Sequence, residues 1–212
     1  MKNLLYKEFS LAVHPFYLVA GIVFGALAMI PQWIFLLIPL YFCFVTVPNL
    51  LGQYKANKDN QFAALLPIPK SAAVKARILA FAILEVLHMI GVLVFAFVHN
   101  AVYGVPNFGF DLNGSYFGVV FVMFAIFNLV LFPLYYRTAD KFGFPVILSI
   151  TGAFLFAAAM EILASINPGF QRFMEQRQDV QIFLPIVGLL LFAAATYAAF
   201  RLSARRFEFV DL

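Results

Sequence analysis

Six apolar runs alternate with short polar segments along the 212 residues. Crossing a bilayer takes about 20 helical residues, and five of the runs are about that long. The runs cover residues 16–30, 33–51, 78–98, 115–135, 144–166 and 181–200. The first must begin earlier, near Leu11, or enter and leave the membrane on one face. The pattern predicts an all-α integral membrane protein with six spanning helices and a single transmembrane domain over residues 1–212.

Composition supports this prediction and excludes other classes. The chain is 64% hydrophobic and only 11% charged, whereas a soluble domain is about one quarter charged. Six spans leave too few residues for a separate water-soluble catalytic domain. Pro39 and Pro48 interrupt the second run, and we expect them to kink or end that helix.

Positive charge is unevenly divided between the two faces. Twelve of the 14 Lys and Arg residues flank the runs on one face, and only Arg172 and Arg177 lie on the other. Lys and Arg concentrate on the cytoplasmic side of membrane proteins. We therefore expect both termini in the cytoplasm of a bacterial plasma-membrane protein. The basic excess then reflects topology, and no nucleic-acid partner is expected.

The first fifteen residues have the pattern of an amphipathic helix. Leu5, Phe9, Ala12 and Phe16 share one face, while Asn3, Lys7, Ser10 and His14 share the other. This spacing is typical of a helix that lies flat at the membrane interface. The alternative is the ordinary basic flank of a first span.

A second short helix is predicted between the second and third spans. Asp59 and Asn60 belong to a segment suited to a helix cap, and Phe62, Leu65 and Leu66 follow at spacings of three and four. Pro67 then ends the helix. Its apolar edge needs either lipid headgroups or another protein as a partner.

Three ionisable residues fall inside or near the ends of apolar runs. Glu85 and His88 are three residues apart in the third run, and Glu161 lies near the outer end of the fifth. Ionisable groups within spans are costly and are functional candidates. For the first pair, hydrogen bonding between helices, gating or cargo contact, and a proton or metal role all stay open. For Glu161, we expect the side chain to reach the outer interface.

Other chemistry finds little support. Phe121, Phe124 and Phe127 recur at intervals of three and could line a path for amphipathic cargo or simply face lipid. The lone Cys43 permits no intrachain disulfide or cysteine metal cluster. We find no catalytic motif and no phosphate-binding loop, so we expect neither an enzyme nor a bound metal or cofactor.

Four segments resemble the small permeases of the ABC-2 transporter family. They are Leu4-Leu5-Tyr6-Lys7-Glu8-Phe9; the loop from Lys58-Asp59-Asn60-Gln61-Phe62 through Leu66-Pro67-Ile68-Pro69-Lys70 to Val74-Lys75-Ala76-Arg77; Pro133-Leu134-Tyr135-Tyr136-Arg137 with Lys141-Phe142-Gly143; and Ser203-Ala204-Arg205-Arg206-Phe207-Glu208. The chain departs from the family pattern at Leu65, where a serine is common.

The resemblance implies the transmembrane subunit of an ABC exporter. Such a subunit pairs with a second copy or a sister subunit and with two ATPase subunits, which bind ATP and Mg. The short helix would then be the coupling helix that docks on the ATPase, through Asp59, Asn60, Phe62, Leu65, Leu66 and Pro67. Family members export hydrophobic or cationic peptides and drugs. The principal alternative is an ATP-independent secondary transporter with Glu85 and His88 as its proton site.

Overall fold

The computed structural model describes residues 2–65, 67–103, 109–138 and 141–209, and it is helical throughout, with no strand in these ranges. Short helices come first: α1 (Lys2–Lys7), a π-helical turn (Glu8–Ala12), α2 (Pro15–Gly25), a 3-10 turn (Ala26–Met29), α3 (Leu37–Tyr41), a second π-helical turn (Phe42–Thr46), α4 (Val47–Ala56) and α5 (Asp59–Leu65). Longer ones follow: α6 (Lys70–Val102), α7 (Gly114–Tyr135), α8 (Gly143–Ile166), the short α9 (Pro168–Glu175), and α10 (Gln178–Glu208).

Five helical segments are long and apolar enough to cross a membrane: Leu37–Ala56, α6, α7, α8 and α10. A sixth crossing requires Lys2–Ser10 and Pro15–Met29 to act together, although they are bent by 71°. The prediction of a multi-pass, all-helical membrane protein is confirmed. The predicted count of six becomes five or six, because the first apolar run is short and sharply separated from the helix before it.

The second span differs from its predicted boundaries and continues past its prolines. It begins at Leu37 instead of residue 33, because Gln32 adopts a φ of 59° and the chain turns there. Pro48 has no N–H, so it cannot donate the hydrogen bond of a regular α-helix. A π-helical turn over Phe42–Thr46 lies just before it and accommodates this lost hydrogen bond without ending the helix. The helix therefore runs on to Ala56 instead of ending at Pro48.

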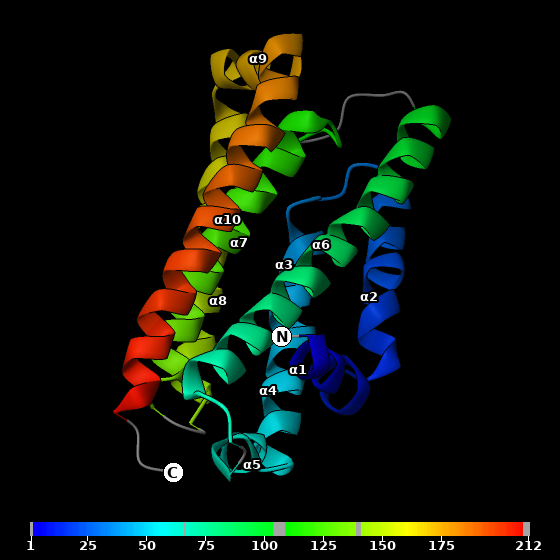
Figure 1. Cartoon of the computed structure of the whole chain (residues 1–212). Coiled ribbons are helices and arrows are strands. Elements are labelled where there is room, and N and C mark those ends of the chain that lie inside the picture. Colours follow the sequence, from blue (N-terminus) through cyan, green and yellow to red (C-terminus); the bar gives the residue numbers. More distant parts are fainter. Residues whose placement is uncertain (1, 66, 104–108, 139–140, 210–212) are drawn as a thin grey trace.

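The helices form two groups, which are joined by the second span and by the direct packing of α6 against α10 (Figure 1). α7 packs against α10 and α8, while α2 packs against α6. The α3–α4 segment contacts both α6 and α8 and lies between the groups in Figure 1. α5 lies at one end of the bundle and α9 at the opposite end, and we call these the α5 end and the α9 end.

Glycines allow the closest helix crossings. A Cβ atom at Gly21 of α2 would lie 2.5 Å from the His88 Cα of α6, and one at Gly118 of α7 would lie 2.6 Å from the Leu184 backbone of α10. Gly188 of α10 meets Gly118 at the same crossing. Close backbone approach of this kind gives van der Waals contact that lipid cannot replace. Gly21 and Gly118 therefore serve packing within the chain.

We predict that Gly118→Ala lowers the free energy of unfolding by about 1–3 kcal/mol, because the added methyl group must separate two backbones. Gly143→Ala is the matched control, since nothing lies within 4 Å of a Cβ at that position. Thermal unfolding in lipid nanodiscs measures both. An equal unfolding temperature for the two variants would contradict the close crossing.

Candidate functional site

α5 presents an apolar edge at its end of the bundle. Leu65 is 85% exposed and Phe62 is 51% exposed, and Pro67 is also exposed. Leu66, predicted to belong to the same edge, lies outside the described residues. A short helix with this much apolar exposure needs a partner surface.

The first turn of α5 faces inward instead. Asp59 and Asn60, predicted as docking residues, are only 9% and 3% exposed. Both accept hydrogen bonds from the Arg77 guanidinium of α6: Nη2 donates to Asp59, and Nη1 donates to Asn60 Oδ1 at 2.5 Å. Asn60 Nδ2 also donates to the Tyr135 hydroxyl at 3.2 Å. These two residues therefore hold α5 to the spans and do not form its outer edge.

Arg77 also connects to the N-terminal segment and to α4. Its Nε lies 3.7 Å from Glu8 Oε2, and its guanidinium stacks 4.0 Å from the centre of the Tyr54 ring. The Tyr54 hydroxyl donates to the same glutamate at 2.6 Å. Arginine suits this position because its planar group can stack on a ring while donating to several oxygens.

Lys7 completes what we call the Arg77 cluster, which comprises Lys7, Glu8, Tyr54, Asp59, Asn60, Arg77 and Tyr135. Its Nζ lies 2.7 Å from Asp59 Oδ1 and 3.3 Å from Glu8 Oε1. Two cations thus balance two carboxylates, with side chains no more than 15% exposed. A movement of α5 therefore pulls directly on α1 and α6, because buried charges resist separation from their partners.

A second polar group lies in the middle of the spans. Asn128 of α7 donates to Glu85 Oε2 of α6 at 2.8 Å and to Thr196 Oγ1 of α10 at 3.4 Å. Glu85 and Asn128 are both fully buried. Of the roles left open for Glu85, the geometry shows hydrogen bonding between helices.

His88 lies apart from this group. Its ring packs 6.0 Å from the Phe24 ring of α2 and 5.6 Å from the Phe42 ring, measured between centroids. Within the described ranges no hydrogen bond joins it to Glu85, and no group of residues there could hold a metal ion. The two residues therefore face different helices and do not form one combined site in this conformation.

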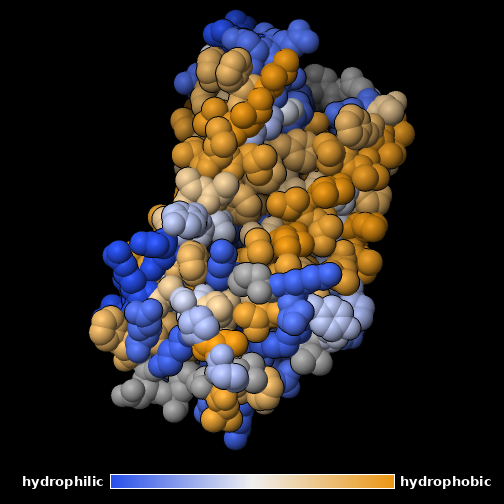
Figure 2. Space-filling model, viewed as in Figure 1, coloured by the Kyte–Doolittle hydropathy of each residue, from blue (hydrophilic) through white to orange (hydrophobic). Residues whose placement is uncertain are grey.

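A surface groove runs between α6 on one side and α7 with α10 on the other. It contains a cavity of about 300 Å³ toward the α5 end and one of about 350 Å³ toward the α9 end. Phe121 lines the second cavity. Phe124 and Phe127, predicted with it as a cargo path, are fully buried in the core. Figure 2 shows hydrophobic side chains over much of this face and hydrophilic ones gathered at the two ends.

Glu161 of α8 lies at the α9 end and is only 8% exposed. The sequence favoured a side chain that reaches the interface, but the carboxylate lies against Gly109 and is buried. Glu175 lies nearby at the end of α9. Burial, with a smaller contribution from Asp111, raises the pKa of Glu175 to about 7.

Sequence reasoning missed the centre of the Arg77 cluster and the Asn128 bond. Arg77 entered only as a cation of the loop and as the last residue of a family-like segment, although it directly precedes the apolar run of the third span. Glu8 stands alone as an acid in a basic segment, and that was the one available signal. Nothing in the spacing shows that two residues 69 positions apart, Glu8 and Arg77, meet in the fold.

We predict that Arg77→Gln destabilises the protein by about 3–5 kcal/mol, because two buried carboxylates lose a cation. It also frees α5, so trypsin cleaves faster after Lys58, which directly precedes the helix. Unfolding temperature and timed proteolysis measure the two effects.

Arg137→Gln is the matched control, because Arg137 is exposed and follows two residues after Tyr135, which bonds to Asn60 of α5. It should change neither readout. Equal cleavage of native protein and Arg77→Gln would contradict the anchoring of α5 by the cluster.

Comparison with known proteins identifies the family of this chain. A family model described as ABC-2 family transporter protein matches residues 3–208, which is nearly the whole chain. No curated protein and no solved structure matches the chain. The match spans both the α5 element and all of the long apolar helices. The chain belongs to the ABC-2 family of transporter proteins.

Proposed function

We propose that this protein is the transmembrane subunit of an ATP-driven exporter and that α5 docks on a separate ATPase subunit. The observation that carries the proposal is the contrast within α5, whose first turn is fixed by buried ion pairs while Leu65 is 85% exposed. A helix held at its base and apolar at its edge suits the transmission of force from a partner. Membership of the ABC-2 family supports an ATPase as that partner.

Charge distribution supports the orientation that docking requires. The Lys and Arg residues that flank the spans lie mainly toward the α5 end, which would therefore face the cytoplasm together with both termini. ATP and Mg would be bound there by the ATPase subunits, because this chain has no phosphate-binding loop. The chain itself would not be an enzyme.

We also propose a dimeric assembly, and the exposed apolar surface of the bundle supports it. α10 and α8 expose most of their apolar length, with many of their leucine and isoleucine side chains at the surface. A second copy or a sister subunit would cover part of that surface, and two ATPase subunits would complete the transporter. The remaining surface would face membrane lipids.

The groove between α6 and α10 suggests the kind of cargo. Its cavities are lined almost entirely by apolar side chains, and Lys75 stands at the α5 end. Such walls favour amphipathic, peptide-like or lipophilic molecules, since a strongly polar cargo would find few hydrogen-bond partners. Export of this cargo across a bacterial plasma membrane is the function that we propose.

Leu65→Asp tests the docking surface. We expect it to reduce co-purification with a co-expressed ABC ATPase subunit that the native protein retains by about tenfold or more, because a charge replaces an apolar contact at the interface centre. ATPase stimulation should fall in parallel. Phe209→Asp is the matched control, since Phe209 is 87% exposed at the end of α10 and not on α5. Unchanged recovery with Leu65→Asp would overturn the proposal.

Glu85→Gln separates the exporter from a proton-coupled secondary transporter. The amide keeps an oxygen that can accept the bond from Asn128, so we expect ATP-dependent uptake of a lipophilic dye into inverted vesicles to stay within about threefold of the native rate. Uptake without ATP that is driven by a pH gradient and abolished by Glu85→Gln would establish the proton-coupled alternative.

A further inference from the structure

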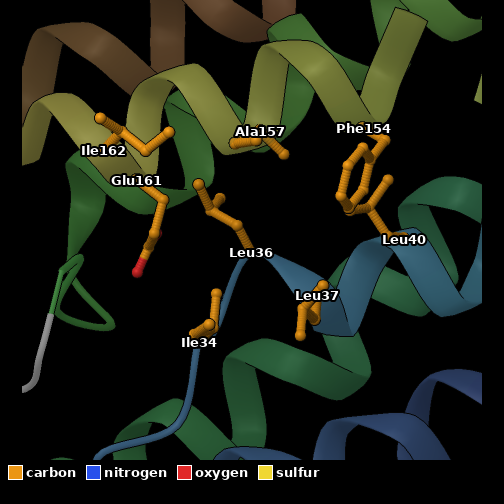
Figure 3. A pocket seen from close by; sticks show the side chains of 9 residues that line it. Ile34, Leu36, Leu37, Leu40, Phe154, Ala157, Glu161 and Ile162 are labelled. Carbon is orange, nitrogen blue, oxygen red and sulfur yellow. The ribbon is translucent and has the colours of Figure 1, made fainter. Parts of the chain in front are cut away.

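A separate pocket opens between the α3 segment and α8, away from the groove described above. It has a volume of about 210 Å³, and its walls are apolar side chains, among them Leu36, Leu37, Leu40, Phe154 and Ala157. Figure 3 shows the Glu161 carboxylate at one end of this apolar pocket, beside Ile34 and Leu36. It is the one ionisable side chain among the lining residues.

The carboxylate lacks the partners that a buried charge needs. Glu161 is 8% exposed, and neither of its oxygens has a hydrogen-bond partner with good geometry in the part of the chain that the structure describes. The one backbone group of the described residues that interacts with it is the Phe110 N–H. None of the ion pairs within the described ranges includes Glu161. A carboxylate at this depth without a cation must either take up a proton or pair with a ligand of opposite charge.

The surroundings reinforce the negative potential. Glu175 is close enough to Glu161 for repulsion, and Asp111 is in turn close to Glu175. Of the two cations on this face, Arg177 is already paired with Asp179 at 2.5 Å, and Arg172 is exposed on α9. The α9 end of the pocket therefore favours a positive ligand group.

Gly109 makes room for this arrangement. Its φ is +84°, a conformation that favours glycine, and a side chain there would collide with the Glu161 carboxylate. The backbone thus approaches the acid closely and shields it from water without neutralising it.

We propose that the pocket binds a single-chain primary alkylammonium, with the ammonium group on Glu161 and the start of the chain between α3 and α8. A primary ammonium carries one positive charge and donates up to three hydrogen bonds, which suits a carboxylate that forms no ion pair with the described residues. An apolar cavity of about 150 Å³ is known to hold benzene, so this pocket accepts a headgroup and several methylene groups but not a bulky drug. The rest of the chain can leave toward lipid past Ile162, which is 56% exposed.

This inference does not depend on the ATPase proposal. Binding is measured on the chain alone, without nucleotide or partner subunits. A failure of ATPase docking would therefore leave it standing, and a failure of ligand binding would leave the docking proposal standing.

The single tryptophan provides the readout, because Trp33 directly precedes Ile34 of the pocket wall. Full-length protein in phosphatidylcholine nanodiscs is titrated with 10-bromodecylammonium, whose bromine quenches tryptophan fluorescence. We expect saturable quenching. The uncharged 10-bromodecanol should bind about tenfold more weakly or worse, because it lacks the charge-assisted hydrogen bonds.

Two variants and a control locate the site. Glu161→Gln should weaken ammonium binding by about tenfold or more, and Ala158→Phe should abolish it by filling the pocket that Ala158 lines. Glu208→Gln, an exposed acid at the α5 end, should bind as the native protein does. Thermal unfolding checks that each variant is folded.

The proposal is overturned if quenching does not saturate or if the alcohol and the ammonium quench native protein equally. It is also overturned if folded Glu161→Gln or Ala158→Phe binds as tightly as the native protein. The alcohol comparison uses only native protein, so it decides the question even if both variants misfold.

Discussion

The structure depends most on the burial of one arginine. Arg77 is only 2% exposed, and a guanidinium cannot shed its charge, so carboxylates and an aromatic face must surround it. Those partners come from the N-terminal segment, α4, α5 and α7. The requirement to solvate a single ion therefore joins elements that are far apart in the sequence, and it fixes the short α5 helix against the long spans.

The same principle distinguishes the three polar sites of the chain. In the Arg77 cluster, cations and carboxylates balance, which suits a rigid joint. Asn128 donates to Glu85 and to Thr196, and these two hydrogen bonds join three helices in the middle of the bundle. Glu161 lines a pocket and forms no ion pair with the described residues, and there we propose a cationic ligand. Similar side chains acquire different roles because their neighbours differ.

The lipid environment explains why so much of the remaining surface is apolar. Lipid is as apolar as leucine, so exposed leucine and isoleucine on α8 and α10 cost little, and tight packing appears only where glycines let backbones touch. The most closely packed helix pairs described by glycine contacts are accordingly α2–α6 and α7–α10. Between these pairs, α6 packs on α10 and Asn128 bonds to Glu85, while two apolar pockets open along the outer edge of the same contact.

The sequence by itself determined the features that a bilayer imposes on a chain. These are the apolar runs of spanning length, the all-helical structure, the asymmetry of charge and the apolar edge at Phe62 and Leu65. These features depend on the local sequence pattern and on the free energy of moving side chains from water into hydrocarbon, so they can be predicted without knowing the fold. Only the tertiary structure decided that Asp59 and Asn60 turn inward, that Phe124 and Phe127 enter the core, that Glu85 and His88 face different helices, and that Gly118 meets Gly188. Each of these depends on contacts between distant segments, and no spacing along the chain encodes the rotation of one helix against another.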